Sequence, residues 1–430
     1  MKIFLFLFLL APLVVSGEEN TAAQLYAIHG QATLLPQWHP AFPAAYSGYN
    51  SLNSDSELDA SFSTSLFLGL LTWEGGYFYS TSEVTGGRAF SDLAGIAAFP
   101  NDDLSRTGDG NPVFNQAEVY FQQVIGLGGE KETIDEESTQ LSANWDISRI
   151  VLTAGKFIQT DFLDGNDYAH DPRTQFMNLG LVDNAAWDFA SNVYGDTWAL
   201  LAELNQKVWS LRLCSAMVAD AAIGENLDGN IAQARGDSLE LEWRYGDENN
   251  AGKISALGYL NHARMGNYRD AVELSTGTPD ITLTRGYSQK YGVGINWHQS
   301  FNQVGGLFAR LGWNDGQREA WAQTSVDQTL SWGGTLKGGL WGRPDDQMGL
   351  GFVVSGLSAE HQAYLTAGGN DFGIGDGALH YAPEGIAELY YLYKPVSYLG
   401  LTLDLQFVAN PAFNQDRGPV FITAGRIHIE

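Results

Sequence analysis

The sequence has only one cysteine, Cys214, among its 430 residues, so the chain cannot form an internal disulfide. It also has little positive charge: 23 Lys and Arg residues stand against 50 Asp and Glu residues, which gives a formal net charge of −27. Such a charge repels phosphate backbones and argues against nucleic acid as a partner. Cations and neutral solutes are the partners that the charge allows.

Long apolar runs are also absent, except at the start of the chain. Lys2 is followed by an apolar run over 3–15 and by the small residue Gly17, which is the pattern of a secretory signal peptide. We expect residues 1–17 to be removed on export, leaving residues 18–430. Further along, polar residues interrupt each apolar segment before it reaches the about 20 residues of a spanning helix. A membrane-spanning form would therefore use strands, because only helices and closed barrels satisfy their backbone hydrogen bonds in lipid.

What the sequence has in abundance is alternation of polar and apolar residues. Within 238–245 the polar set is Ser238, Glu240, Glu242 and Arg244, and the apolar set is Leu239, Leu241, Trp243 and Tyr245. A period of two places the two sets on opposite faces of a β-strand. In a soluble sandwich the apolar face would pack on a core, whereas in a transmembrane barrel it would face lipid and the polar face would face water.

Similar alternation recurs along the whole chain. The seventeen strand-like segments lie near 24–34, 57–72, 75–84, 115–127, 138–146, 148–159, 196–205, 207–219, 238–245, 251–264, 289–302, 304–314, 327–340, 346–358, 384–395, 399–409 and 419–429. Single-chain bacterial barrels have an even number of strands, so we expect sixteen. In 115–127, Gln116 and Glu118 are expected on the polar face and Ala117 on the apolar face.

Longer polar inserts separate the strand pairs. They lie at 35–56, 85–114, 160–195, 220–232, 265–288, 315–326 and 359–383, with brief helical patterns at 92–98, 270–275 and 359–367. Short turns at one rim and long loops at the other are typical of an up-and-down barrel. We therefore expect an all-β fold: a single transmembrane antiparallel barrel of about 16 strands, with short helical segments in inward or rim loops.

The inserts also carry motifs that resemble a known family. In chain order they are His39-Pro40-Ala41-Phe42, Tyr168-Ala169-His170-Asp171-Pro172-Arg173, Trp341-Gly342-Arg343-Pro344-Asp345-Asp346, His361-Gln362-Ala363-Tyr364-Leu365 and Asn410-Pro411-Ala412-Phe413-Asn414. Together they resemble the carbohydrate-selective porin family, the OprB type of outer-membrane porins, over residues 26–428. The resemblance implies a sixteen-stranded barrel in the outer membrane of a Gram-negative bacterium. Small sugars such as glucose would diffuse passively through its polar lumen, which inward loops narrow.

The resemblance implies no catalysis and no cofactor. The eight histidines are scattered without the spacing of metal ligands, so we also expect no metal. The expected partners are small carbohydrates, outer-membrane lipid and the barrel-assembly machinery, and a homo-oligomer stays open. Barrels of this kind commonly finish in an aromatic residue that the assembly machinery recognises, whereas this chain ends in Ile427-His428-Ile429-Glu430.

A sugar pore needs groups that hydrogen-bond to hydroxyls, and aromatic rings for the apolar faces of the sugar. On the strands, the candidates are Glu118, Gln122, Glu240, Glu242, Arg244, Arg310 and Asp404. The insert over 161–187 is the leading candidate for a constriction, with Asp161, Asp164, Asn166, Tyr168, His170, Asp171, Arg173 and Trp187. A second candidate region contains Glu83, Arg88 and Arg106. For each residue the alternative is structural: solvating the wall, pairing across strands or fastening a loop.

Other kinds of protein share parts of this sequence pattern. A general or cation-preferring porin and a secreted glycan-binding β-protein both stay open. A glycosidase would use two carboxylates across the scissile bond, but among 50 acidic residues such pairs arise by chance. The sequence also has no Gly-x-Ser-x-Gly elbow of the kind that serine hydrolases use. We therefore do not expect an enzyme.

Overall fold

The computed structural model describes residues 24–104, 110–302, 304–323 and 325–430. The expected signal peptide over 1–17 and the candidate Arg106 lie outside these residues.

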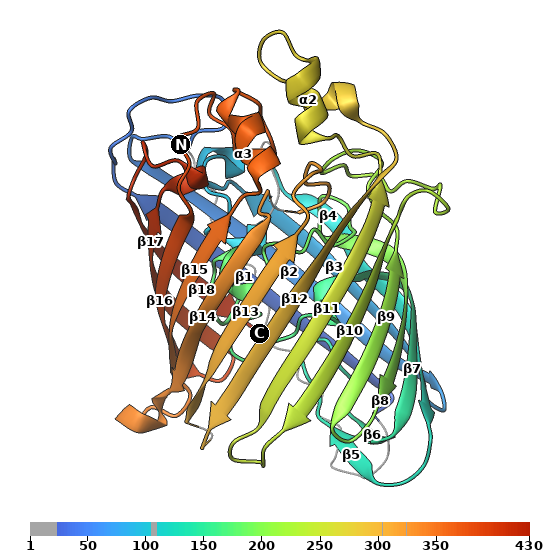
Figure 1. The fold of residues 1–430 in the computed structure, drawn as a ribbon. Helices are drawn as coiled ribbons and strands as arrows, with labels where there is room; N and C mark the ends of the chain where they lie inside the picture. Colours follow the sequence, from blue (N-terminus) through green and yellow to red (C-terminus); the bar gives the residue numbers. More distant parts are fainter. Residues whose placement is uncertain (1–23, 105–109, 303, 324) are drawn as a thin grey trace.

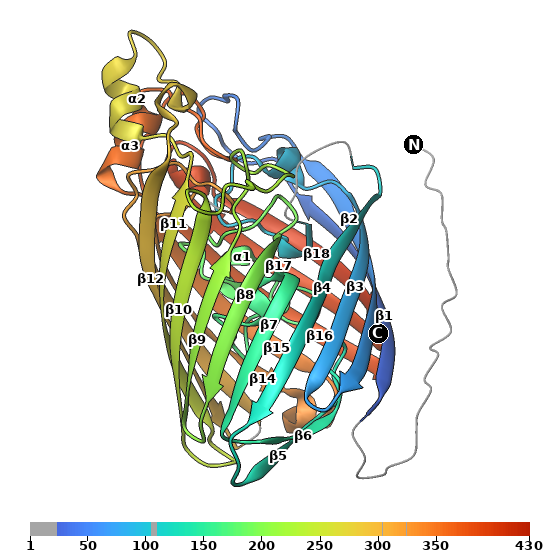
Figure 2. The ribbon, with the colours of Figure 1, turned by 90° about the vertical axis from the view of Figure 1, so that its right-hand side faces the viewer.

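Sixteen antiparallel strands close into one barrel, and each strand pairs with its neighbours in sequence order (Figures 1 and 2). The strands are β1 (Tyr26–His39), β2 (Glu57–Trp73), β3 (Gly76–Gly87), β4 (Val113–Gly126), β7 (Arg149–Ile158), β8 (Asp196–Asn205), β9 (Trp209–Ala216), β10 (Arg235–Tyr245), β11 (Gly252–Ala263), β12 (Ser288–Phe301), β13 (Gly305–Asn314), β14 (Gln328–Lys337), β15 (Gln347–Gly356), β16 (Glu384–Val396), β17 (Leu399–Ala409) and β18 (Val420–Ile429). The barrel closes where β1 pairs with β18. At this seam the Thr33 hydroxyl lies 2.9 Å from Nδ1 of His428 inside the lumen. The expected sixteen-stranded up-and-down barrel is confirmed.

The expected strand over 138–146 is wrong as a wall strand. It belongs to the connection between β4 and β7, where β5 (Lys131–Ile134) and β6 (Ala143–Asp146) form a separate two-stranded sheet. We call residues 127–148 the rim hairpin. Leu141 of this hairpin is fully buried, in the same cluster as Tyr77 and Tyr79 from the inner face of β3. Alternation predicts a strand with one apolar face, but it does not predict the strand with which that strand pairs. For this reason the sequence pattern placed 138–146 in the barrel wall.

The two rims of the barrel differ in the length of their connections. Most long connections leave the upper rim in Figure 1, and the turns at the lower rim are short apart from the rim hairpin with β5 and β6. The helical elements are η1 (Phe90–Leu93), η2 (Asp102–Leu104), η3 (Gln159–Asp161), α1 (Leu179–Val182), α2 (Tyr268–Leu274), η4 (Ile281–Thr284), η5 (Gly338–Trp341), α3 (Ala359–Thr366) and η6 (Pro411–Phe413). The expected helical patterns at 270–275 and 359–367 correspond to α2 and α3, whereas 92–98 is not helical beyond the short turn η1. In outer-membrane barrels the short turns are periplasmic, so we call the lower rim the periplasmic rim.

Across the described residues, no helix has the length and apolar character required to cross a membrane.

The outer surface of the barrel is apolar, as 238–245 illustrates. On β10, Leu239, Leu241 and Trp243 are 47%, 51% and 62% exposed, whereas Glu240 and Glu242 point inward and are 1% and 4% exposed. This confirms the expected assignment of the two faces. In a soluble sandwich the same leucines would be buried, so the outward apolar belt favours a lipid environment.

The expected faces of 115–127 are wrong at Gln116 and at Ala117, which lines the lumen, because β4 contains a bulge. Thr81 of β3 pairs with Glu118, but the next residue, Ser82, pairs with Gln116, so Ala117 is the extra residue. An extra residue in one strand shifts the alternation by one. Gln116 therefore lies on the outer face, where its side-chain amide bonds the hydroxyls of Ser80 and Ser82 at 3.1 and 2.9 Å.

Candidate pore constriction

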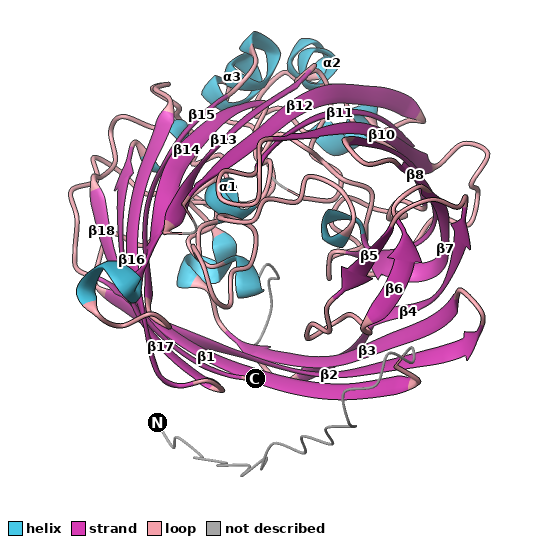
Figure 3. Cartoon of the chain, turned by 90° about the horizontal axis from the view of Figure 1, so that it is seen from below, coloured by secondary structure: helices cyan, strands magenta, loops and turns pink. Residues whose placement is uncertain are grey.

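Residues 159–195, between β7 and β8, enter the lumen from the long-loop rim. We call them the inserted segment; its helix α1 lies within the ring of strands in Figure 3. The segment is anchored to one side of the wall. The Asp164 carboxylate lies 3.0 Å from Nε of Arg310 on β13. The backbone N–H groups of Met177 and Asn178 donate to the Glu388 carboxylate on β16 at 2.6 and 3.0 Å.

Apolar packing supports the same attachment. Phe176 is fully buried, and its ring packs edge-on against Phe308 of β13 and Tyr390 of β16. On β11, the Tyr259 hydroxyl donates to the carbonyl of Ala186 at 3.0 Å. The inserted segment thus fills the side of the lumen next to β10–β16.

An opening remains on the other side of the lumen, against β1, β3 and β4. It is a cavity of about 520 Å³. Its lining residues are Gln31, Thr81, Glu83, Thr85, Asp102, Asp103, Leu104, Asn115, Ala117, Glu118, Glu137, Ser138, Thr139, Ile158, Thr160, Asp161, His170, Asp171, Pro172, Arg173, Asp183, Phe189, Val193, Tyr194, Gly195 and Gln323. Wall strands, the inserted segment, the 88–112 connection and the rim hairpin therefore all reach one opening.

Arg173 crosses between these elements. Its guanidinium bonds Asp103 through Nε at 2.6 Å and Glu83 through a terminal nitrogen at 2.5 Å. Asp103 also accepts a bond from the Ser63 hydroxyl on β2 at 2.7 Å. Burial alone would lower the pKa of Arg173, but the two carboxylates outweigh it and raise the pKa. The arginine stays charged and ties the tip of the inserted segment to β3 and to the 88–112 connection.

Carboxyl groups crowd the rest of the opening. Glu118 accepts a hydrogen bond from the Thr81 hydroxyl at 2.7 Å. Burial, and next the charge of Glu118, raise the pKa of Asp161 well above its ordinary value. Burial, and next the charge of Asp103, raise the pKa of Asp102 to about 7. Closely spaced carboxyl groups repel one another's negative charge, so Asp102, with a pKa of about 7, holds its proton part of the time at neutral pH and can then donate a hydrogen bond.

Comparison with known proteins identifies the family. The model of the carbohydrate-selective porin family, OprB, matches residues 50–430. The chain belongs to this family. No curated protein matches its sequence. Among solved structures, the high-pH form of OprB from Pseudomonas putida has a TM-score of 0.70 and 16% identity, with 94% of each chain covered. The outer-membrane channel DcaP of Acinetobacter baumannii has a TM-score of 0.52 and 10% identity, covering 94% of this chain and 96% of that one.

Membership of the OprB family sets the function class and the location. The protein is a carbohydrate-selective porin of the Gram-negative outer membrane. The family and its fold are those of outer-membrane channels, which argues against the alternative of a secreted glycan-binding β-protein.

Six of the candidate residues from the sequence line the opening of this OprB-family porin. They are Glu83, Glu118, Asp161, His170, Asp171 and Arg173. The structure brings these together from β3, β4 and the inserted segment, which supports 161–187 as the main source of a constriction.

The remaining candidates lie away from the cavity lining. Asp164, Asn166, Glu240 and Arg310 fasten the inserted segment to the wall through buried hydrogen bonds and an ion pair. Glu242 accepts from Arg244 at 3.1 Å and from Arg212 at 3.0 Å, which joins β9 and β10. Gln122 is buried and bonds Thr153 of β7, and Asp404 is buried and accepts from Gln406 on its own strand. Arg88 is exposed at the long-loop rim.

The two expected aromatic candidates do not line the opening. Trp187 is 2% exposed and packs against Phe189 in the interior cluster. Tyr168 packs edge-on against His298 of β12. Both rings lie where the inserted segment meets the wall, and they serve packing because an apolar ring gains most from leaving water.

Sequence analysis missed several residues of the opening. Asp102 and Asp103 form an acidic pair inside the 85–114 insert. The pair is visible in the sequence and could have been included among the candidate residues. Gln31 and Asn115 lie on strand positions that face the lumen. Glu137–Thr139 gave no usable signal, because 138–146 was assigned to the wall.

Proposed function

We propose that this porin passes small neutral sugars, monosaccharides such as glucose, down their concentration gradient through the opening between the inserted segment and the β1–β4 wall. The mixed donors and acceptors of that opening carry the proposal. Gln31 and Asn115 offer amides, Thr81 offers a hydroxyl, and Arg173 offers a guanidinium beside the carboxyl groups. Sugar hydroxyls both donate and accept hydrogen bonds, so they can exchange water for these groups at little cost.

Recognition would rest on hydrogen bonds more than on stacking. Of the larger rings, only His170, Phe189 and Tyr194 contribute to the described lining of this opening. A wet site of this kind binds weakly, because each hydrogen bond to the sugar replaces one to water. Weak binding suits passage, since the solute must also leave.

A cation-preferring porin is the second candidate, and the charge of the opening favours it. Carboxyl groups outnumber the single guanidinium of Arg173 in the described lining. A cleft with one sign of charge concentrates counter-ions. The two candidates are compatible, since a channel can pass neutral sugars and still prefer cations among ions.

Swelling of liposomes that contain the purified porin tests the proposal. We expect glucose to enter faster than a zwitterionic amino acid of similar size, and a trisaccharide to enter slowest. Protein-free liposomes give the background rate. Equal rates for the sugar and the amino acid would show a general pore, and the absence of glucose entry would reject a sugar channel.

A further inference from the structure

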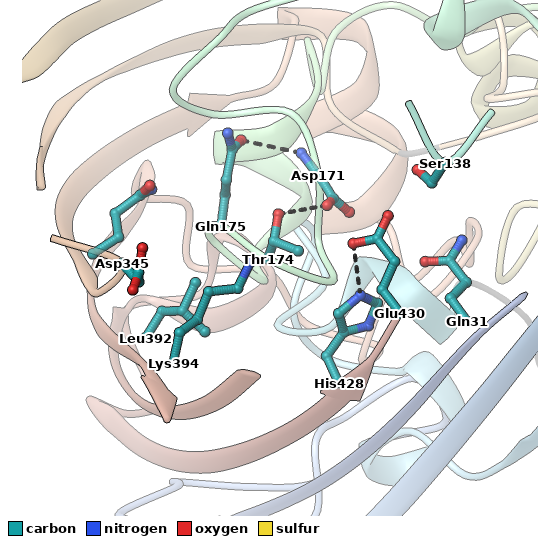
Figure 4. A pocket seen from close by; sticks show the side chains of 11 residues that line it. Gln31, Ser138, Asp171, Thr174, Gln175, Asp345, Leu392, Lys394, His428 and Glu430 are labelled. Atoms are coloured by element: carbon teal, nitrogen blue, oxygen red, sulfur yellow. Dashed lines mark hydrogen bonds and ion pairs between the residues drawn. The ribbon is translucent and has the colours of Figure 1, made fainter. Parts of the chain in front are cut away.

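A second cavity, drawn in Figure 4, lies near the periplasmic rim, because its lining includes Asp345 and Lys394 close to the lower ends of β15 and β16. Its volume is about 320 Å³, and its lining residues are Gln31, Ser138, Asp171, Thr174, Gln175, Asp345, Gln347, Leu392, Lys394, His428 and Glu430. This volume falls within the about 300–1,000 Å³ of small-molecule sites. Ten of these eleven side chains are polar, so the cavity suits a hydrophilic solute.

The inserted segment supplies a rigid side of this cavity. The Thr174 hydroxyl donates to the Asp171 carboxylate at 2.5 Å. The side-chain oxygen of Gln175 accepts from the backbone N–H of His170 at 2.7 Å and of Asp171 at 3.2 Å. These bonds hold the Asp171 carboxylate in place toward the cavity, as Figure 4 shows.

The rim hairpin supplies Ser138 from the opposite direction. Its position is fixed by contacts with the inner wall: the Trp145 ring nitrogen donates to the Tyr77 hydroxyl at 2.8 Å, and Arg149 bonds Glu132 at 2.5 Å. Next to Ser138, Glu136 pairs with His29 of β1 at 3.0 Å. A connection of this length is unusual at a periplasmic rim, where barrels keep short turns.

Three polar side chains of the cavity are free to bind a solute. Within the described parts of the chain, the side chains of Gln31 and Asp345 make no hydrogen bond or ion pair, and that of Lys394 makes no hydrogen bond, although its charge acts on the nearby Glu430. They offer an amide, a carboxylate and an ammonium group, which together can accept from and donate to hydroxyls. Asp345 and Lys394 stand on one side of the cavity in Figure 4, with Gln31 on the other side.

We propose that this cavity is an exit subsite, which binds one small neutral sugar after it has passed the constriction. Sugar hydroxyls would donate to Asp171 and Asp345 and accept from Lys394 and Gln31. The proposal rests on the proposed sugar channel. It is supported by continuity, because Gln31, Ser138 and Asp171 line both cavities. A sugar that leaves the constriction meets these groups before it reaches the periplasm.

Protection of an engineered cysteine by sugar tests this subsite. In the full chain with Cys214→Ala, Ser138→Cys places a thiol in the cavity, and Glu74→Cys places one at the β2–β3 turn of the same rim as a matched control. A water-soluble thiol reagent is added to the protein in liposomes, with and without glucose. We expect glucose to slow modification of the cysteine at 138. The modification rate should fall to half at the glucose concentration that occupies half of the subsites. The cysteine at 74 should react at the same rate throughout.

Two further variants and one flux measurement make the outcome decisive. Asp345→Asn and Lys394→Met in the Ser138→Cys background should weaken the protection. If Ser138→Cys does not assemble, Lys394→Cys takes its place. Unchanged reactivity in glucose, a thiol that never reacts, or protection by magnesium chloride in place of glucose would each overturn the exit subsite. Glucose entry measured on the same liposomes separates the two proposals: entry without protection rejects the subsite alone, and no entry rejects the sugar channel.

Discussion

Replacing Arg173 by glutamine should make the channel more selective for cations. In the native protein its guanidinium pairs with both Glu83 and Asp103, at 2.5 and 2.6 Å, and offsets one of their two negative charges. Glutamine keeps a hydrogen-bonding side chain but removes the charge, so both carboxylates then act on ions that pass through the opening.

The size of the effect follows from the size of the opening. A cavity of about 520 Å³ has the volume of a sphere about 5 Å in radius, which we take as the distance from the guanidinium to a passing ion. One charge at about 5 Å changes the energy of an ion by about 0.8 kcal/mol in water, or about 0.5 kcal/mol with screening at 0.1 M salt. Cations gain and anions lose this energy, so the ratio of their permeabilities should rise about five- to fifteenfold.

Reversal potentials of single channels in a potassium chloride gradient measure this ratio. Arg235→Gln is the matched control, because it removes the same charge from the outer face of β10, where Arg235 is 48% exposed and paired with Asp237. A reversal potential in Arg173→Gln that matches the native protein would show that ions do not pass near this arginine. The inserted segment would then not form the constriction.

Three more predictions concern the membrane face, the opening and the rim. Leu241→Arg should destabilise the barrel in lipid by about 2–4 kcal/mol, measured by urea unfolding, because the outward Leu241 would place a charge among acyl chains. The pKa of Asp102 is raised to about 7, so this group is neutral below that pH and cation preference should fall as pH drops from 8 to 6. His361 of α3 is buried between Asp327 and Asp371, and although burial lowers its pKa, these carboxylates raise it to about 9. Its contribution to stability is complete below pH 6.5 and is lost as pH rises through 9, so His361→Gln should flatten thermal stability over that range.

Each of these has a result that contradicts it. A neutral effect of arginine at 241 would mean that the two faces of β10 are reversed. The change in cation preference near pH 7 should disappear in Asp102→Asn, and its persistence there would point to another group. Equal pH profiles for the native protein and His361→Gln would show that the buried imidazole does not hold the long-loop rim together.

The sequence predicted the wall far better than the lumen. The alternation in 238–245 correctly predicts which side chains face lipid, since one face of each strand meets a uniform solvent. It fails at Gln116, where a bulge shifts the period, and at 138–146, where a short amphipathic segment pairs with its own hairpin. Both failures come from pairing, which is a non-local property that strand periodicity does not encode.

The candidate site shows the same limit. The composition of 161–187 pointed to the right insert, but it could not distinguish Arg173, which reaches the opening, from Asp164, which fastens the segment to Arg310. That difference depends on how a loop of irregular structure folds within the barrel. Trp187 illustrates the point for aromatic residues, because its ring is equally suited to a sugar and to a packed interior.

The attachment of the inserted segment to β10–β16 divides the inner wall into two regions, which should differ in how well they tolerate amino-acid substitutions. Lumen-facing residues of β10–β16 behave as the interior of a soluble domain, so substitutions there should disturb assembly. Lumen-facing residues of β1, β3 and β4 border the opening, although Tyr77 and Tyr79 also pack against the rim hairpin and Glu83 holds Arg173. Engineering for other solutes should therefore begin at Gln31 of β1, whose side chain lines the opening and makes no hydrogen bond within the described residues.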